Sequence, residues 1–398
     1  MAQARKAFVG RFLVPSSFEF FPSLVTCAVE MPTGPSDDSR AAKRLRPTDE
    51  AVSGLPFVQA EINFGGGTHK TSAEAIVAER VTVYDGRADV SRFAMARDGF
   101  ELVDVPGIGD VQEGGRLDLY DPDVAVETFF PRVEALVRRH LGARRAIAFD
   151  HIVRNRARLS EELARAAGSK DMAPSAISEQ STSDESPLEE DACPALPKTK
   201  FLQGALSTAH GDYTARSGRT RAEQLLEPWS TPGEIAKALA GRFAIVNVWY
   251  PLETVKADPL ALCLWESCSP DDVVTNRLIF PHRVGETYKV RSSPGQRWIY
   301  FSDVTADEAI LLKTFDSVDD GSVSRFCLHS AFRLPEQDSP SPPPDRQSLE
   351  VRVLVFYGEG TEGLALNFVP PHMVGEASAT EIMAGPLRTE LVDTGGAW

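Results

Sequence analysis

The sequence has few cysteines, and they lack the spacings of a disulfide framework or a zinc site. The five cysteines are an odd number without a CxxC pair, and they lie at Cys27, Cys193, Cys263, Cys268 and Cys327. Disulfide-rich small domains and thiolate zinc sites both use paired cysteines, so neither is indicated. Free thiols favour a reducing compartment, and we therefore expect a cytoplasmic protein.

Long hydrophobic runs and clusters of positive charge are also missing. No segment approaches the roughly 20 apolar residues of a membrane-spanning helix, and the longest candidates are strand-sized runs such as residues 244–248. The net charge is −15, whereas phosphate binding needs a clustered basic face. The sequence therefore predicts neither a membrane span nor a nucleic-acid partner.

The chain of 398 residues, 42% of them hydrophobic and 25% charged, has the composition of a globular protein. Two polar stretches, residues 1–54 and 158–205, are predicted to be a disordered leader and a disordered insertion, because they lack periodic apolar residues. Residues 55–157 are predicted to form an N-terminal α/β part, residues 206–391 the core and residues 392–398 a flexible tail. No repeat of about 20 to 50 residues is visible, which argues against solenoids and propellers.

Strand-like runs dominate the globular regions. A single helix is expected over residues 121–141, capped by Asp121 or Asp123, kinked at Pro131 and ended by Gly142. The expected strands cover residues 57–64, 81–84, 100–103, 146–149, 243–249, 260–265, 288–290, 298–301, 309–315, 326–332 and 349–357. This pattern predicts a mainly β fold, an antiparallel barrel or sandwich with flanking helices.

A proline-rich stretch separates the last two expected strands. We expect residues 335–344 to form the turn of a hairpin that pairs residues 326–332 with residues 349–357.

One group of residues carries metal chemistry. His210 and Asp212 are two residues apart, so on a strand their side chains project from the same face. His329 lies in a second strand-like run much later in the chain. Two histidines and one carboxylate form the facial triad of non-haem Fe(II) oxygenases, which leaves coordination positions open for a cosubstrate and O₂. We therefore predict that His210, Asp212 and His329 bind Fe(II).

A keto-acid cosubstrate needs a partner for its distal carboxylate, and a guanidinium offers paired charge-assisted hydrogen bonds. Arg352, a charge inside the apolar strand 349–357, is the first candidate, and Arg346 is the second. A structural salt bridge of Arg352 with Glu350 or Asp316 is the alternative interpretation. Asn247 and Trp249 share one face of another expected strand.

Nine segments, in order along the chain, resemble the fungal hydroxylase/desaturase family that includes the gibberellin desaturase, the aspirochlorine-pathway enzyme and the cephamycin methoxylation component. They are residues 148–154 (AFDHIVR), 210–214 (HGDYT), 247–252 (NVWYPL), 258–263 (DPLALC), 283–288 (RVGETY), 297–301 (RWIYF), 312–317 (LKTFDS), 329–332 (HSAF) and 348–352 (SLEVR). The long leader, a triple-glycine stretch at residues 65–67 and the polar insertion depart from the family pattern.

This resemblance implies a double-stranded β-helix (jelly-roll, cupin-like) core and 2-oxoglutarate-dependent oxidation of a small organic molecule in secondary metabolism. The expected cofactors are Fe(II), 2-oxoglutarate and O₂, and a homodimer or a pathway enzyme is the candidate partner. Three alternatives stay open: the same triad with another chemistry, such as methylenedioxy-bridge or endoperoxide formation or partnership with a methyltransferase; a cupin-like accessory protein that binds metal weakly; and a hydrolytic zinc site. No HExxH motif accompanies the histidines to support the zinc site.

Overall fold

The computed structural model describes residues 48–67, 75–111, 114–166, 202–228, 230–279, 284–358 and 388–392. All of them belong to one unit of the chain, residues 45–398. Most of the expected leader and insertion, and residues 393–398 of the expected tail, lie outside the described residues. No described helix is both long and apolar enough to cross a membrane.

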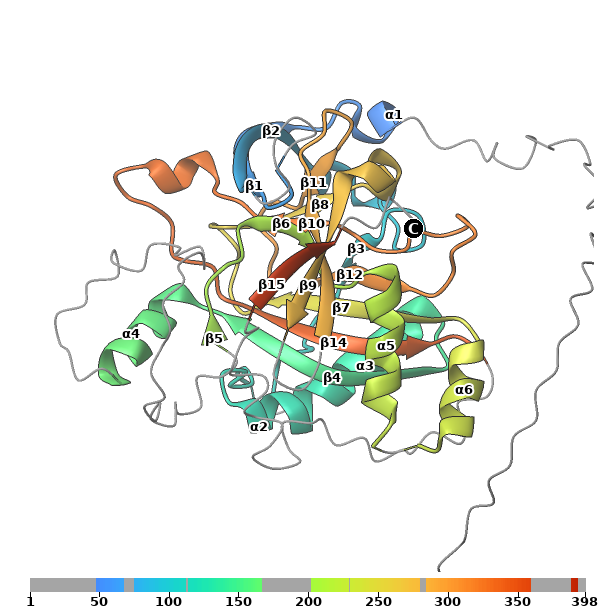
Figure 1. Ribbon diagram of the computed structural model, residues 1–398. Helices are drawn as coiled ribbons and strands as arrows, with labels where there is room; N and C mark the ends of the chain where they lie inside the picture. Colours follow the sequence, from blue (N-terminus) through green and yellow to red (C-terminus); the bar gives the residue numbers. More distant parts are fainter. Residues whose placement is uncertain are drawn as a thin grey trace, which may run out of the picture. The chain divides into compact units, whose positions relative to one another are not determined.

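Two sheets carry the fold (Figure 1). The strands are β1 (Phe57–Phe64), β2 (Val77–Asp85), β3 (Phe100–Asp104), β4 (Arg145–Arg154), β5 (Leu202–Gln203), β6 (Thr208–Gly211), β7 (Phe243–Pro251), β8 (Leu260–Cys263), β9 (Val273–Ile279), β10 (Val284–Val290), β11 (Trp298–Tyr300), β12 (Glu308–Asp316), β13 (His329–Ala331), β14 (Ser348–Phe356) and β15 (Arg388–Val392). The helices are α1 (Thr48–Val52), α2 (Pro122–Val124), α3 (Phe130–Leu141), α4 (Arg156–Ala166), α5 (Ala215–Leu226) and α6 (Pro232–Ala240).

The first sheet has nine strands in the order β1-β2-β11-β8-β13-β6-β10-β9-β15. An additional pairing of β1 with β6 closes the first six of these strands into a ring. The second sheet has six strands in the order β3-β12-β7-β14-β4-β5. This arrangement is a mainly β jelly-roll core, and the expected fold class is confirmed.

Helix α3 covers the outer face of the second sheet. Phe130, Val133, Leu136 and Val137 are buried on one side of the helix, and they pack in one apolar cluster with alternate residues of β7 and β14. Figure 1 shows α3 lying beside β4 and β14. With one face under α3, the other face of this sheet is left to line the interior.

The expected helix over residues 121–141 exists, but it is not continuous. Asp121 caps the short helix α2, and a π-helical turn over Ala125–Phe129 precedes α3. Pro131 follows the π-helical turn, and the wider turn accommodates a residue that has no N–H to donate. Gly142 ends the helix with φ of 61°, a left-handed conformation suited to glycine.

The expected hairpin is wrong. Strand β13 pairs with β6 and β8 in the first sheet, while β14 pairs with β4 and β7 in the second. The segment containing residues 335–344 therefore crosses between the sheets. An apolar strand run does not specify its partner, and a proline-rich connection suits a crossover as well as a turn.

Two expected boundaries also differ from the structure. The end of the expected leader forms helix α1, and its Ala51 and Val52 pack in an apolar cluster with Phe93 and Phe100. The start of the expected insertion continues helix α4, Arg156–Ala166. Its end contains β5, which pairs with β4. The short apolar stretches at both places are ordered because they pack against a sheet.

Candidate metal centre

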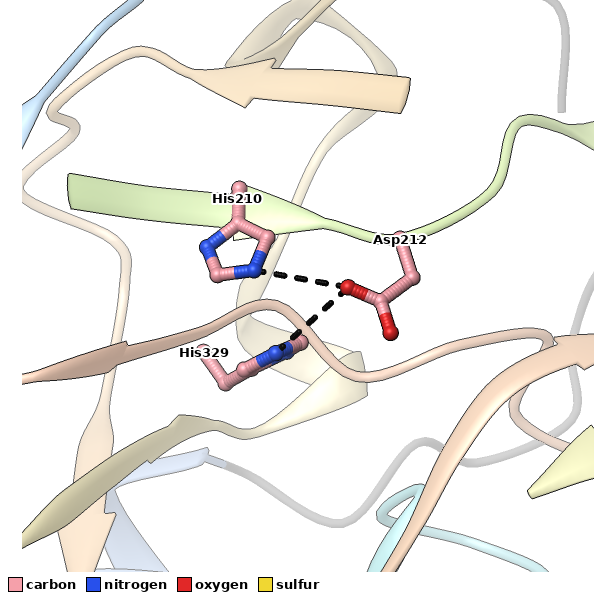
Figure 2. A group of neighbouring side chains, drawn as sticks. All are labelled: His210, Asp212 and His329. Atoms are coloured by element: carbon pink, nitrogen blue, oxygen red, sulfur yellow. Dashed lines mark ion pairs between the residues drawn. The ribbon is translucent and has the colours of Figure 1, made fainter. Parts of the chain in front are cut away.

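His210, Asp212 and His329 come together at the inner end of strand β6. His210 lies on β6 directly opposite His329 of β13, and the centroids of the two rings are 4.3 Å apart. Asp212 follows β6 immediately, and its side chain turns toward both imidazoles (Figure 2). Within the described residues, these three side chains are the group whose ligand atoms lie within 4.8 Å of one another. The pairing of two strands that are distant in sequence produces this cluster.

The tautomers of both imidazoles are set by the backbone. His210 Nδ1 lies 2.8 Å from the carbonyl oxygen of Thr208, and His329 Nδ1 lies 3.1 Å from that of Cys327. Each Nδ1 therefore carries the proton and donates it, which leaves each Nε2 with a free lone pair. Those two Nε2 atoms lie 3.4 Å and 3.8 Å from Asp212 Oδ1. This donor set fits a divalent transition metal.

Burial favours the neutral form of His329. The residue is 4% exposed, and desolvation, aided by the neighbouring His210, lowers its pKa to about 4. The imidazole is therefore neutral at physiological pH, as a metal ligand must be.

The second oxygen of Asp212 is held by two other side chains. Asn247 Nδ2 donates a hydrogen bond of 2.8 Å to Asp212 Oδ2, and Arg352 Nε lies 3.8 Å from the same oxygen. Burial by itself raises the pKa of Asp212. The close approach of His210 and His329 and the positive charge of Arg352 outweigh that effect and hold the pKa well below its usual range. Oδ1 is thus left to face the histidines.

The helix that follows Asp212 is anchored to strand β10. Thr214 caps α5, and its hydroxyl donates to Glu286 Oε2 at 3.1 Å. Ser217 Oγ donates to the carbonyl oxygen of Glu286 at 2.6 Å. These bonds fix the chain on the far side of Asp212, so its backbone is constrained from both ends.

Arg352 lies beside this cluster. Its strand β14 is positioned by pairing with β4 and β7, and not by the expected hairpin. The side chain lies on the inner face of β14, where its Nη1 is 2.7 Å from Asp150 and its Nη2 is 3.2 Å from Glu350. Burial lowers the pKa of Arg352, but the three surrounding carboxylates raise it well above the ordinary value. Of the two partners considered for a salt bridge, Glu350 is present. Asp316 instead pairs with Lys313 and Arg242.

Arg346 lies just before β14 and is 6% exposed. Its Nη1 donates to the carbonyl oxygen of Asp258 at 2.6 Å, and its guanidinium carbon lies 5.6 Å from the ring centre of Trp249. Burial lowers the pKa of Arg346 to about 10. Its Nε and the Oγ of Ser348, also fully buried, have no hydrogen-bond partner among the described residues. Buried polar atoms without partners are uncommon, and a bound ligand is one way in which such atoms are satisfied.

Sequence reasoning missed Asp150, Asp258 and Ser348. Asp258 has φ of +45°, a conformation in which its carbonyl accepts the bond from Arg346. The spacing of Arg346 and Ser348 was the available signal, because residues two apart in an extended chain project to the same side. Asn247 lies beside the cluster, where it contacts Asp212, and Trp249 packs in an apolar core.

The jelly-roll core and the His–Asp–His cluster define the class: the protein is an Fe(II)/2-oxoglutarate-dependent oxygenase, an enzyme class that uses O₂. The chain belongs to the family described as oxidoreductase/YMDC permease-like domain, which matches residues 48–356. The expected membership in the fungal hydroxylase/desaturase group is confirmed by its relatives.

The relatives cover most of the chain. The hydroxylase/desaturase efuI of Hormonema carpetanum is 26% identical over 288 residues, 70% of this chain and 83% of that protein. The gibberellin cluster GA4 desaturase of Gibberella fujikuroi is 27% identical over 325 residues, 72% and 90% of the two chains. The solved structure of the iron and alpha-ketoglutarate-dependent endoperoxidase NvfI has a TM-score of 0.55 and 21% identity, covering 76% of this chain and 99% of that one. That likeness shows a shared fold.

Proposed function

We propose that this enzyme holds Fe(II) through Nε2 of His210, Oδ1 of Asp212 and Nε2 of His329. One observation carries the proposal: both imidazoles donate through Nδ1 to backbone carbonyls and turn Nε2 toward the same carboxylate oxygen. Bound there with 2-oxoglutarate, iron would supply activation of O₂ coupled to decarboxylation of the keto acid.

Arg346 and Ser348 are the proposed clamp for the distal carboxylate of 2-oxoglutarate. Among the described residues, Arg346 Nε and the hydroxyl of Ser348, two residues further on, are both buried without a partner. A carboxylate would satisfy both with charge-assisted hydrogen bonds. Arg352 is less suited, because its Nη1 and Nη2 are already engaged by Asp150 and Glu350. Both arginines therefore remain in the proposed site, and Arg346 is the preferred residue for binding the distal carboxylate.

Arg352 acts in this proposal as a positioning residue. It lies between Asp150, Glu350 and Asp212, and with Asn247 it holds Oδ2 of Asp212 away from the histidines. Partners of this kind fix the orientation of metal ligands, and their loss lowers metal affinity.

The proposed reaction is hydroxylation or desaturation of a small organic molecule in fungal secondary metabolism. Relatives named hydroxylase/desaturase and GA4 desaturase support this class of reaction. We also propose that the enzyme works in the cytoplasm, with a homodimer or a pathway enzyme as its candidate assembly, which light scattering of the purified full chain would decide.

The test is Fe(II)-dependent O₂ consumption and succinate release by anaerobically purified protein given ascorbate and 2-oxoglutarate. His210→Ala is expected to abolish both and to lower bound iron. Arg346→Ala and Ser348→Ala should keep iron but weaken 2-oxoglutarate use, by about 10-fold or more for the arginine, since hydrogen bonds to charged groups contribute about 1.5–3 kcal/mol. Unchanged iron binding in His210→Ala would contradict the proposed ligands. If only Arg352→Ala weakens 2-oxoglutarate use, then Arg352, and not Arg346, binds the distal carboxylate.

A further inference from the structure

A cavity of about 460 Å³ opens beside the proposed metal centre. Asp212 and Arg352 line one side of it, and strand β4 contributes Asp150. Helix α5 and the β9–β10 strands form the rest, with Arg221 among the helix residues. The volume falls in the range of about 300–1,000 Å³ that is usual for small-molecule sites. Because it begins at a proposed iron ligand, the cavity is placed to hold the molecule that is oxidised.

Positive charge is concentrated in this cavity, although the whole chain has a net charge of −15. Its lining includes four arginines, at positions 216, 221, 277 and 352, against three carboxylates, at positions 150, 212 and 286. Iron would add further positive charge beside Asp212. A locally positive cavity in an acidic protein attracts an anionic ligand.

The three carboxylates already have partners. Asp150 lies 2.7 Å from Arg352. Asp212 faces the histidines. Glu286 accepts a hydrogen bond from Thr214 and lies 3.9 Å from Arg216. None of them is therefore left to neutralise Arg221.

Arg221 takes part in no ion pair among the described residues. Its guanidinium carbon lies 5.7 Å from the ring centre of the buried Phe149, a cation–π contact that orients the group without using its N–H donors. Thr220 and Gln224 of the same helix, and Tyr213 just before it, also line the cavity and offer neutral polar groups.

We propose that this cavity binds the organic substrate through a carboxylate on that substrate, with Arg221 as the binding residue. The inference rests on the proposed function, because it takes the adjoining cluster to be the iron site. A guanidinium recognises a carboxylate through two parallel hydrogen bonds, which would orient the substrate relative to the iron as well as bind it. The proposal thus predicts a substrate class, carboxylic acids, rather than one compound.

The test uses matched pairs of probes: 2-naphthoate and cyclohexanecarboxylate, each beside its methyl ester. Binding to the full chain, with Zn(II) in place of iron and with saturating 2-oxoglutarate, is measured by ligand-observed NMR. We expect each acid to bind about 10-fold more tightly than its ester, as loss of a charge-assisted hydrogen bond implies. Arg221→Gln should remove that difference, and Arg221→Lys should retain part of it.

Arg219→Gln is the matched control, because Arg219 is on the same helix, pairs with Glu223 and does not line the cavity. It should keep the full preference for acids. Equal binding of acids and esters by the wild type, or an unchanged preference in Arg221→Gln, would overturn the proposal. Displacement of the acids by 2-oxoglutarate would also overturn it, since the carboxylate would then be that of the cosubstrate.

Failure of this inference can be told apart from failure of the proposed function. Zinc and 2-oxoglutarate binding are measured on the same samples, and the acid–ester comparison is repeated without metal. If the protein binds metal and 2-oxoglutarate but shows no preference for acids, the carboxylate site is contradicted and the proposed function is not. If the protein binds no metal but still prefers acids to esters through Arg221, the iron assignment is contradicted and the carboxylate site is supported.

Discussion

At the scale of single residues, the site depends on how Asp212 is held. Its Oδ1 faces both histidines, and its Oδ2 accepts from Asn247. Asn247 is fully buried in β7, so the surrounding sheet fixes the position of this donor. Asn247 therefore decides which carboxylate oxygen is available to a metal.

We expect Asn247→Ala to lower the affinity for Fe(II) by about 10- to 100-fold, the range found when outer-shell partners of metal ligands are removed. Anaerobic titration with Fe(II), followed by isothermal calorimetry, measures the change. Asn276→Ala is the control, because Asn276 is also a buried strand asparagine but makes its hydrogen bond to Thr287. Equal affinities of Asn247→Ala and wild type would show that Asp212 is oriented by other groups.

The residue scale also shows the limit of sequence reasoning about charged side chains. His210 and Asp212 are two residues apart, and local strand geometry suffices to place them on one face. Arg346 lies just before β14 and Arg352 lies within it, and their even separation in sequence cannot distinguish their roles. What separates them is the set of partners: Asp150, remote in sequence, occupies Arg352, and the carbonyl of Asp258 leaves Arg346 partly unpaired.

At the scale of elements, helix α5 must pack closely on strand β12. Gly218 faces the ring of Phe315, and a Cβ at that position would overlap the ring. We expect Gly218→Ala to lower the free energy of unfolding by about 1–3 kcal/mol, because the ring or the helix must shift. Urea unfolding followed by circular dichroism measures this.

Gly233→Ala on α6 is the matched control, since a Cβ at Gly233 would have nothing within 4 Å. Alanine favours the helical backbone, so this change should be neutral or stabilise by up to about 1 kcal/mol. Equal effects of the two substitutions would mean that α5 is free to move away from Phe315.

A second contact between elements depends on pH. His140 at the end of α3 lies 3.2 Å from Glu101 of β3. The hydrogen bond with Glu101 raises the pKa of His140, and the same bond lowers the pKa of Glu101. The stabilisation from His140 is complete below its unfolded pKa of about 6.5 and is lost as pH rises through the folded value; that from Glu101 is present above about pH 4.3 and is lost as pH falls through its folded value.

His140→Gln should therefore lower the melting temperature more at pH 5.5 than at pH 8.5. The effect should be small, because both side chains are about one third exposed, 32% and 28%, and solvent screens the pair. Thermal melts at the two pH values, with Arg139→Gln on the same helix as control, measure it. A temperature difference that does not change with pH would show that the contact contributes nothing through its charge.

The predicted hairpin failed because strand pairing is not a local property of the sequence. Residues 326–332 and 349–357 both read as strands, and both strands exist. Each finds its neighbours elsewhere, β13 beside β6 and β8, and β14 between β4 and β7. Strand pairing depends on which faces must be buried together, and neither short-range spacing nor a proline-rich connection contains that information.

At the scale of the whole molecule, metal binding should stabilise the fold. The proposed ligands come from β6, the residue after its end and β13, so the unfolded chain does not present them together. A metal that binds the folded state alone adds about 2.7 kcal/mol at 100 times its dissociation constant. We expect anaerobic Fe(II) to raise the melting temperature by several degrees, and a chelator to reverse the change.

His329→Ala should abolish this metal-dependent shift, whereas His140→Gln, which alters a histidine remote from the cluster, should keep it. Differential scanning calorimetry with and without metal measures both. A shift of equal size in His329→Ala would mean that the metal stabilises the protein from another site.

The sequence by itself determined the local part of this protein. Alternation of apolar residues and turn-forming residues placed most strands and helix α3, and the His-x-Asp spacing with a second strand histidine indicated the metal chemistry, because these patterns act over a few residues. Tertiary structure alone decided the strand partners of β13 and β14, the partners of the two arginines and the position of Arg221 in the cavity wall. Those features arise from groups that are distant in the chain and adjacent only after the sheets have packed.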